Sequence, residues 1–503
     1  MRLTPVRWLL LAALVPIRVL AAPGDTPDPK RAAGNCLQLA SVRAAAHDYA
    51  GAIAQYDRAI SLDAGLVDAY RGRGHARGEL DDYAGMVADY NRVIALGEGA
   101  ATDYATRGYA HVHLLQLEAA LADFDWALVR DPKYKELLLI RGEVKVNLGD
   151  NRGACRDFDQ LLASEPANLD ARCGRAIANK NLGNEDAALR DFDAVIMADP
   201  HRAEAFEHRG LLMLARGLLK PARRDLDTAI ALDPKRPDAY LGRTEVALKM
   251  GDPDAALRIF DECLRQIPDC GVAYINRASL KRRLGRDAEA IDDCDRALAL
   301  KTPQGELAYL NRALANLGLG RRDEARNDVE LAIRMKPDSA EICFSRGGIR
   351  QIAGDYPGAL ADYDRVIAGQ DRLSVYAHFN RTLLLQRQDR PDPAQLPARD
   401  IPAGWPRPIA LFLNGEITAE AFLAAAQTGD SVSRTDQVSE ASYYRGMRLL
   451  LQGHPREAGI QFQACVDLKL FNQLTTLLAR AELARLHASE PGVQPPRSDS
   501  ALH

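Results

Sequence analysis

One pattern recurs in this chain at a fixed interval, and that interval is the strongest constraint on the fold. Between residues 120 and 234, small, large and proline residues each advance in steps of 34. The three series are Ala120, Ala154, Ala188 and Ala222; Phe124, Phe158, Phe192 and Leu226; and Pro132, Pro166, Pro200 and Pro234. A constant period of this length is typical of stacked repeats, which cannot bury their apolar faces alone. We therefore expect a repeat array and not a domain with a single core.

A series of arginines extends the same register almost to residue 390. The steps are again 34 residues, except for two steps of 35, and the members are Arg73, Arg107, Arg141, Arg175, Arg209, Arg243, Arg277, Arg312, Arg346 and Arg381. We expect the two inserted residues to lie in loops, near Gly305 and in 369–371. Apolar residues in 189–196 are three and four apart, which indicates one face of a helix, and Pro200 ends that helix. Each unit is therefore predicted to be two helices joined by a turn.

The combined pattern resembles the tetratricopeptide repeat family. Small residues at unit positions 8 and 20, a large residue at 24, a small apolar one at 27 and proline at 32 recur in ten units over 33–373, with a further unit at 439–472. The resemblance implies an all-α superhelical solenoid of helix-turn-helix repeats with a C-terminal capping helix. Glycines such as Gly108 and Gly142 are expected to face the alanines of the partner helices. Ala188→Leu should overpack its helix pair and cost about 1–3 kcal/mol.

The first 21 residues have the pattern of a secretory signal peptide. Arg2 and Arg7 precede an apolar run over 8–17, and Val19-Leu20-Ala21 suits cleavage after Ala21. The alternative is an uncleaved anchor, but the run is shorter than the roughly 20 residues that a span needs. Cys36 lies too far from the run to carry a lipid. We expect a secreted chain without an integral span after cleavage, located in the periplasm if the source is a Gram-negative bacterium.

Six segments are predicted in chain order. They are a signal peptide (1–21), a loose lead-in (22–32), the main array with its capping helix (33–388), a proline-rich linker (389–408), a C-terminal helical module with a further repeat (409–488) and a disordered tail (489–503). Within the module we expect an apolar segment at 409–413, a turn at Asn414-Gly415 and a helix over 418–427.

Composition narrows the function. Charged residues make up 27% of the chain, with a net charge of -4, so nothing in the charge balance favours nucleic acid as a partner.

The sequence contains no phosphate-binding loop and no hydrolase motif, and we expect neither a cofactor nor catalytic residues. His111 and His113 are two apart, unlike zinc ligands on a helix, so no metal site is expected. Five of the eight cysteines fall at core positions of the repeat, namely Cys36, Cys263, Cys294, Cys343 and Cys465. Cys155 and Cys173 are candidates for a disulfide between adjacent helices.

The arginines occupy unit position 7, where leucine is usual in the family, and acids recur in step with them. These acids are Asp89, Asp123, Asp157, Asp191, Asp225, Asp293, Asp328 and Asp362. One interpretation is a charged groove for an acidic ligand. The other is a series of half-buried Arg–Asp pairs inside the stack, where guanidinium and carboxylate match in geometry. We favour the structural interpretation because both series keep the same step.

The last third resembles the C-terminal half of NlpI-like periplasmic repeat proteins. The resemblance is carried by Trp405, the segments 409–413 and 415–418, and a closing repeat with Tyr444-Arg445-Gly446 followed by Ala458, Phe462 and Cys465. It implies an adaptor that gathers cell-wall hydrolases and a processing protease.

Partner contacts are predicted on the first helices, which line the groove in this family. The groove positions become apolar in two consecutive units, at Val272, Ile275, Leu307, Leu310, Leu314 and Leu317. An apolar groove suits an extended or helical peptide. The alternative is that the array packs there against its own C-terminal module.

The function predicted from the sequence is a secreted, non-enzymatic scaffold or adaptor that binds other proteins in the cell envelope, with cell-wall hydrolases or a processing protease as candidate partners. The alternative is a structural subunit of a secretion, pilus or polysaccharide export machine.

Overall fold

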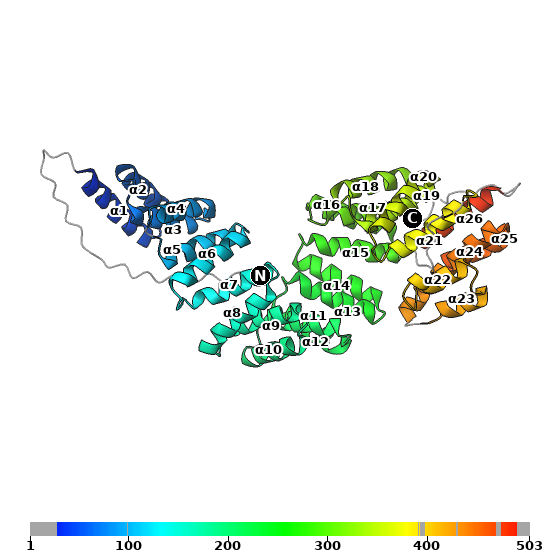
Figure 1. The fold of residues 1–503 in the computed structure, drawn as a ribbon, viewed down its shortest axis with the longest axis horizontal. Coiled ribbons are helices and arrows are strands. Elements are labelled where there is room, and N and C mark those ends of the chain that lie inside the picture. Colours follow the sequence, from blue (N-terminus) through cyan, green and yellow to red (C-terminus); the bar gives the residue numbers. More distant parts are fainter. Residues whose placement is uncertain are drawn as a thin grey trace. The chain divides into compact units, whose positions relative to one another are not determined.

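The structure is a computed structural model that describes residues 28–97, 99–390, 392, 398–428, 431–468 and 474–489. In these residues it has 26 α-helices, one 3-10 helix, η1 (Ala398–Asp400), and no strand (Figure 1). The predicted all-α fold is therefore confirmed. Contacts divide the chain into two units, Met1–Leu212 and Met213–His503, each of which is described by itself. The predicted signal segment and the tail from residue 490 lie outside the described residues.

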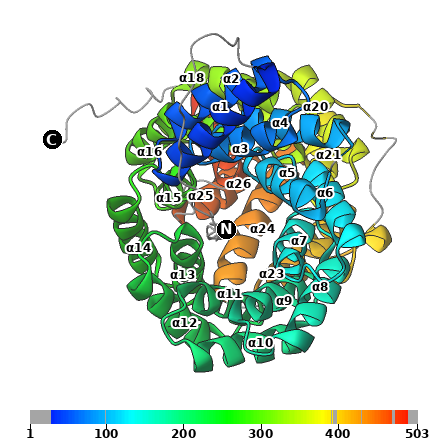
Figure 2. The ribbon, with the colours of Figure 1, turned by 90° about the vertical axis from the view of Figure 1, so that its left-hand side faces the viewer.

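The first unit is a row of helical hairpins in which each first helix packs on the second helix that follows it. Figure 2 shows the first hairpin, α1 and α2, side by side. The helices are α1 (Pro29–Ala45), α2 (Tyr49–Leu62), α3 (Val67–Gly78), α4 (Tyr83–Ala95), α5 (Ala101–His113), α6 (Leu117–Arg130), α7 (Glu136–Asn147), α8 (Asn151–Ser164), α9 (Leu169–Asn181) and α10 (Glu185–Ala198). The next helix, α11 (Ala203–Ala215), crosses the boundary between the units.

The first helix begins earlier than the sequence suggested. Residues 29–32 were expected in a loose lead-in, but α1 begins at Pro29. The side chain of Asp28 accepts a hydrogen bond from the N–H of Lys30, and proline is tolerated in the first turn because its missing N–H has no partner there in any helix. The prolines that suggested a lead-in therefore include one that starts the helix.

The second unit continues the hairpins and then changes architecture. Its hairpin helices are α12 (Leu219–Leu232), α13 (Pro237–Lys249), α14 (Pro253–Gln266), α15 (Gly271–Arg283), α16 (Asp287–Ala299), α17 (Gly305–Gly318), α18 (Arg322–Met335), α19 (Ala340–Ala353), α20 (Tyr356–Ala368) and α21 (Ser374–Gln386). The C-terminal module comprises α22 (Arg407–Leu413), α23 (Ala419–Ala426), α24 (Ser431–Leu451), α25 (Pro455–Asp467) and α26 (Leu474–Ser489).

The predicted linker 389–408 is partly helical. It contains η1 and the start of α22, with Pro408 in the first turn of α22, where proline fits. The helix predicted over 418–427 is present as α23, with the Thr418 hydroxyl accepting a hydrogen bond from the N–H of Ala421.

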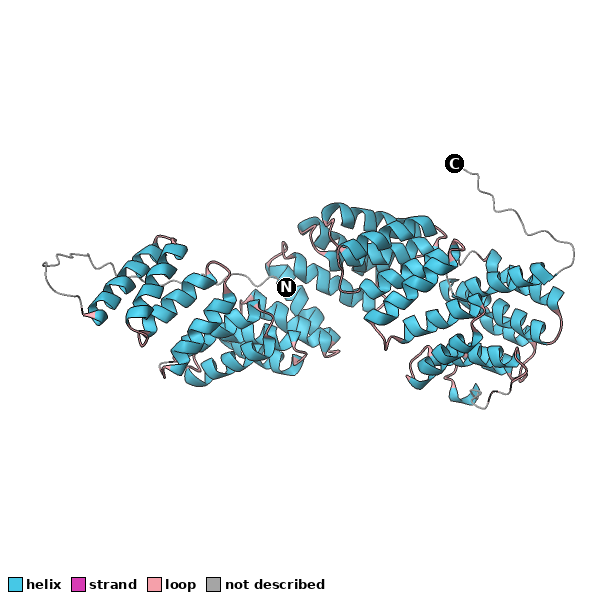
Figure 3. Cartoon of the chain, turned by 90° about the horizontal axis from the view of Figure 1, so that it is seen from above, coloured by secondary structure: helices cyan, strands magenta, loops and turns pink. Residues whose placement is uncertain are grey.

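Short turns with left-handed backbone join the two helices of most hairpins (Figure 3). Glycine occupies this position in seven consecutive hairpins, at Gly149, Gly183, Gly217, Gly251, Gly285, Gly320 and Gly354. Glycine adopts a positive φ without the steric cost that a side chain adds. Both inserted residues lie in loops, as expected, and these loops contain Lys301 and Gln370 at positive φ.

The core is repeated along each unit. Ala120, Ala154 and Ala188 are fully buried, as are the phenylalanines at unit position 24. The glycines at position 8 were expected to face the alanines, and their nearest neighbours across the helix pair are these rings. A Cβ on Gly108 would lie 2.7 Å from Phe124 Cε1, and one on Gly142 would lie 2.6 Å from Phe158 Cε1. The ring reaches across the helix pair, and glycine leaves the space that it needs.

Candidate partner-binding site

The arginine series is a structural feature of the stack, as predicted. Arg175 donates from Nε and Nη2 to the two carboxylate oxygens of Asp191, both at 2.8 Å, and from Nη1 to Asp159 Oδ1 at 2.6 Å. Asp191 lies on the second helix of the same hairpin, and Asp159 on that of the preceding hairpin. The same double pairing links Arg73 with Asp89 and Asp57, Arg141 with Asp157 and Asp125, Arg277 with Asp293 and Asp261, Arg312 with Asp328 and Asp295, and Arg346 with Asp362 and Glu330.

These ion pairs keep the arginines charged and use their guanidinium N–H groups as hydrogen-bond donors within the stack. The hydrogen bond to Asp191 raises the pKa of Arg175, although partial burial acts in the opposite direction. The pairing with the preceding hairpin was missed, although its signal is in the sequence, because a second acid follows two residues after every acid of the predicted series except Asp89, where Asn91 takes that place. Guanidinium groups bound on two sides are poor candidates for an acidic ligand.

The six apolar residues predicted to contact a partner are largely covered by the second unit itself. Ile275, Leu310, Leu314 and Leu317 are buried, and Val272 and Leu307 are half-buried. Ile275 and Leu307 belong to one small cluster around α15 and α17, whereas the three leucines of α17 join a large core that includes α19. Their contact with a partner stays a prediction. Leu317 is the one of the six that lines the pocket between α18 and α19, which is described below.

The C-terminal module packs on α19, which is the first helix of the repeat that follows α17 and α18. Arg485 of α26 donates to the carbonyl oxygens of Gln351 and Ile352 at 2.9 and 3.0 Å, and Leu474 fills the space above Gly348. Figure 1 shows α26 beside α19. The groove face of α19 is therefore occupied by the chain's own last helix.

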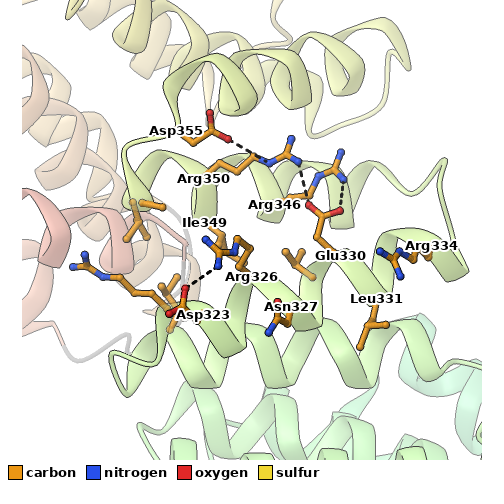
Figure 4. Close-up of a pocket in the computed structure, with 15 residues that line it drawn as sticks. Asp323, Arg326, Asn327, Glu330, Leu331, Arg334, Arg346, Ile349, Arg350 and Asp355 are labelled. Carbon is orange, nitrogen blue, oxygen red and sulfur yellow. Dashed lines mark hydrogen bonds and ion pairs between the residues drawn. The ribbon is translucent and has the colours of Figure 1, made fainter.

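A pocket of about 700 Å³ opens between α18, the second helix of one hairpin, and α19, the first helix of the next. Figure 4 shows Arg326, Glu330 and Arg334 along α18, facing Ile349 and Arg350 of α19. The floor is apolar, because Leu317, Val329, Ile349 and Ile352 reach it with little exposed surface. Leu331 lies at the edge and is 38% exposed. The pocket thus combines an apolar floor with a charged rim.

The pocket coincides with a departure from the repeat that α18 shares with α12, where the same position is Arg223. Unit position 21 is apolar in most hairpins, and its side chain fills the space between a second helix and the next first helix. Leu257 does so in α14, where it shares a core cluster with Ala273 and Leu280 of α15. In α18 this position is Arg326, whose side chain is 64% exposed, so no apolar group fills the space. An arginine at this apolar position marks α18 and α12 alike, so it does not by itself predict the pocket.

The charges of the pocket fall into an inner and an outer group. In the inner group, Glu330 accepts hydrogen bonds from Arg346 and Arg350, both at 3.1 Å, so its charge is balanced. In the outer group, Arg326 pairs with Asp323 at 2.9 Å. Arg322 and Arg334 are exposed, and neither forms an ion pair with any residue in the described part of the chain. Asp355, between α19 and α20, also lines the pocket and pairs with Arg350 at 3.8 Å. The α18 side of the rim therefore carries three arginines and one carboxylate.

Other candidate groups are placed elsewhere. His113 stacks on Tyr83 with ring centroids 4.1 Å apart, and His111 Nδ1 lies 2.6 Å from Gln116 Oε1. No cluster of three metal-binding side chains occurs within the residues that the structure describes. No disulfide joins Cys155 to Cys173 in the structure. Of the described helices, none combines the length and apolar character needed to cross a membrane.

Comparison with known proteins identifies the repeats. Residues 141–200, 213–284 and 310–390 match the tetratricopeptide repeat family. No curated protein matches the chain.

Solved structures similar to the chain are repeat proteins of low identity. A tetratricopeptide repeat protein from Parabacteroides merdae is 23% identical, covers 49% of this chain and 97% of its own, and has a TM-score of 0.39. Yeast Tom70 is 17% identical, covers 84% and 97%, and has a TM-score of 0.36. PilF of Pseudomonas aeruginosa is 19% identical, covers 41% and 94%, and has a TM-score of 0.37.

Solenoid repeats of this kind mediate protein–protein interactions through the extended surfaces that stacking creates. The matched segments share their hairpin geometry and arginine pairing with the rest of the array. The chain is therefore an all-α array of helical hairpins that carries tetratricopeptide repeats.

Proposed function

We propose that this chain is a scaffold that binds other proteins in the bacterial cell envelope, without catalysing a reaction itself. The observation that carries the proposal is the pocket between α18 and α19, where a stack held by internal ion pairs leaves an apolar floor and an arginine-rich rim open to a partner. The envelope location is supported by the signal-peptide pattern of residues 1–21.

The resemblance of the C-terminal third to NlpI-like proteins supports a narrower proposal. In it, the partners are cell-wall hydrolases or a processing protease, which the array holds near one another. The docking of α26 on α19 bears on this role, because it leaves the pocket on the neighbouring face as the candidate contact for partners.

The test is affinity capture from the periplasm with the full chain, using a variant that reverses the rim charge, Arg326→Glu with Arg334→Glu. Arg223→Glu is the matched control, because Arg223 occupies the same unit position in α12 and is 51% exposed. Hydrolases or a protease recovered by wild type and control, but not by the rim variant, would support the proposal. Fractionation of the same cells checks the location.

Two results would contradict the proposal. Retention of the chain in the cytoplasm would remove the envelope role. Recovery of components of a secretion, pilus or polysaccharide export machine by all three proteins alike would favour the alternative function, a structural subunit of that machine.

A further inference from the structure

The pocket between α18 and α19 has features that select the chemistry of its occupant. The inner carboxylate, Glu330, is already neutralised by Arg346 and Arg350. These two arginines also donate to Asp362, which is buried, so they are held in place from behind. An occupant therefore meets a rigid, electrically balanced wall and the apolar surface beside it.

The rim has an excess of positive charge. Arg322, Arg326 and Arg334 lie on α18 along one edge of the pocket, and Asp323 is their only acidic neighbour among the described lining residues of α18 apart from the neutralised Glu330. The Arg326–Asp323 pair is highly exposed on both sides, at 64% and 81%, and exposed pairs of this kind contribute little free energy. A carboxylate from outside can therefore replace Asp323 at small cost.

We propose that the pocket binds an acidic peptide segment of a partner protein, with one apolar side chain on the floor and flanking carboxylates on the rim arginines. This inference rests on the proposed scaffold function and adds the chemistry of the partner. Arginine suits the role because its planar fork matches a carboxylate with two parallel hydrogen bonds. The apolar side chain would lie between Leu331 and Ile349, which face the pocket from opposite helices.

Most of the site lies outside the groove face that the C-terminal module covers. The two share Ile352, which lines the pocket and whose carbonyl oxygen accepts from Arg485. Leu474 and Arg485 contact Gly348, Gln351 and Ile352 of α19, whereas the rim arginines belong to α18. A bound peptide would therefore not need to displace α26.

The experiment measures binding of a fluorescent peptide, Glu-Glu-Leu-Glu-Glu with blocked ends, to the full chain by anisotropy. Matched peptides replace every Glu by Gln, or the Leu by Ser. We expect the acidic peptide to bind, and its affinity to fall with added salt. The affinity of the Gln peptide should be lower by a factor of about ten or more, because the charge-assisted hydrogen bonds are lost. Arg326→Glu with Arg334→Glu should abolish binding, whereas Arg223→Glu should leave it unchanged.

Leu331→Ala tests the apolar contact separately, because Leu331 is at the edge of the pocket and its loss leaves the core intact. This substitution should lower the affinity for the Leu peptide more than the affinity for the Ser peptide. Equal binding of the Glu and Gln peptides, or equal binding by the rim variant and the control, would overturn the inference. If the acidic peptide fails to bind while natural partners are still lost from the rim variant, the inference falls and the scaffold function stands.

Discussion

At the scale of single residues, each arginine of the series serves two carboxylates in different surroundings. Asp191 is 7% exposed, whereas the side chain of Asp159 is 59% exposed. Removing one member of a buried pair leaves an uncompensated charge, while an exposed pair is screened by water. The two sides of Arg175 therefore contribute unequally, and the hairpin's own aspartate dominates.

This inequality gives a prediction for the first unit. Arg175→Met should lower the local free energy of unfolding by about 3–5 kcal/mol, because it strands Asp191. Asp159→Asn should cost under about 1 kcal/mol. Amide hydrogen exchange in α9 and α10 reports this local opening. Equal effects of the two substitutions would show that the buried aspartate is not the main partner.

A second residue makes stability depend on pH. Burial raises the pKa of Glu440 to about 7, although hydrogen bonds from Trp405 Nε1, at 2.7 Å, and Tyr376 favour its charged form. The unfolded chain releases this proton near pH 4.5, so between about 4.5 and 7 the folded chain binds more protons. The contribution of Glu440 to stability is therefore complete at low pH and is lost as the pH rises through about 7.

Glu440→Gln removes the titration and retains an oxygen that can accept from Trp405. Above about pH 7 the variant should be more stable than wild type by about 2–3 kcal/mol, with the difference disappearing toward pH 4.5. Denaturation midpoints across this range measure it. Glu143 in the first unit also has a pKa raised to about 7, through burial and the nearby Asp170 and Glu204, so only the difference between variant and wild type isolates Glu440. Exposed Glu416→Gln is the control and should show no such difference.

At the scale of helices, the contact of α26 with α19 depends on one glycine. A Cβ on Gly348 would lie 2.4 Å from Leu474 Cδ1, which is too close for any side chain unless Leu474 moves. The bond from Arg387 to Glu482 of α26, at 2.7 Å, ties the same helix to the end of α21. The position of α26 therefore rests on a close apolar contact and on ion pairs at its edge.

Gly348→Val should detach α26 while leaving α19 helical. We expect faster amide exchange and proteolysis in α26, since its apolar contact is lost. Gly348→Ala should have a smaller effect, and Leu474→Ala should rescue part of it by making room. If Gly348→Val leaves exchange in α26 unchanged, the helix is held elsewhere.

The hairpins were predictable from the sequence because their period is set by small, large and proline residues at fixed spacing. The Arg–Asp pairing was also predictable, because both series share one step. The facing partner of Gly108 was not, since the pattern gives the position of Phe124 but not the direction of its ring. The covering of Leu310 and Leu314 depends on neighbouring helices such as α19, which no local pattern in α17 specifies. The pocket was not predictable from Arg326, which replaces the buried leucine found at Leu257 and Leu360, because Arg223 makes the same replacement in α12.

At the scale of the whole molecule, each repeat is stabilised by its neighbours, and the C-terminal module closes the end of the second unit. Tyr443 and Tyr444 of α24 are fully buried in the core that α19 and α21 share. Removal of the module would therefore expose apolar surface on those two helices.

Truncation after Gln388 is expected to act locally. Amide exchange should accelerate in α19 and α21, whereas exchange in α3 to α10 should stay as in the full chain, because stability in such arrays is a sum of nearest-neighbour terms. Hydrogen exchange followed by mass spectrometry distinguishes these regions. Acceleration throughout both units would show cooperativity longer than one interface.

The double pairing of the arginines has a consequence for how such a chain can change in length. Most hairpins bring one arginine, one carboxylate for it and one carboxylate for the arginine of the next hairpin, as Arg141, Asp157 and Asp159 illustrate. The exceptions include Asn91, which replaces the second carboxylate, and Ile259, which replaces the first. A gene duplication of a 34-residue segment that holds both carboxylates would give the added arginine two acceptors and leave the acceptors of its neighbours unchanged. Because these ion pairs repeat with the same period as the hairpins, the array can gain such a unit without changes to the sequence of the neighbouring units.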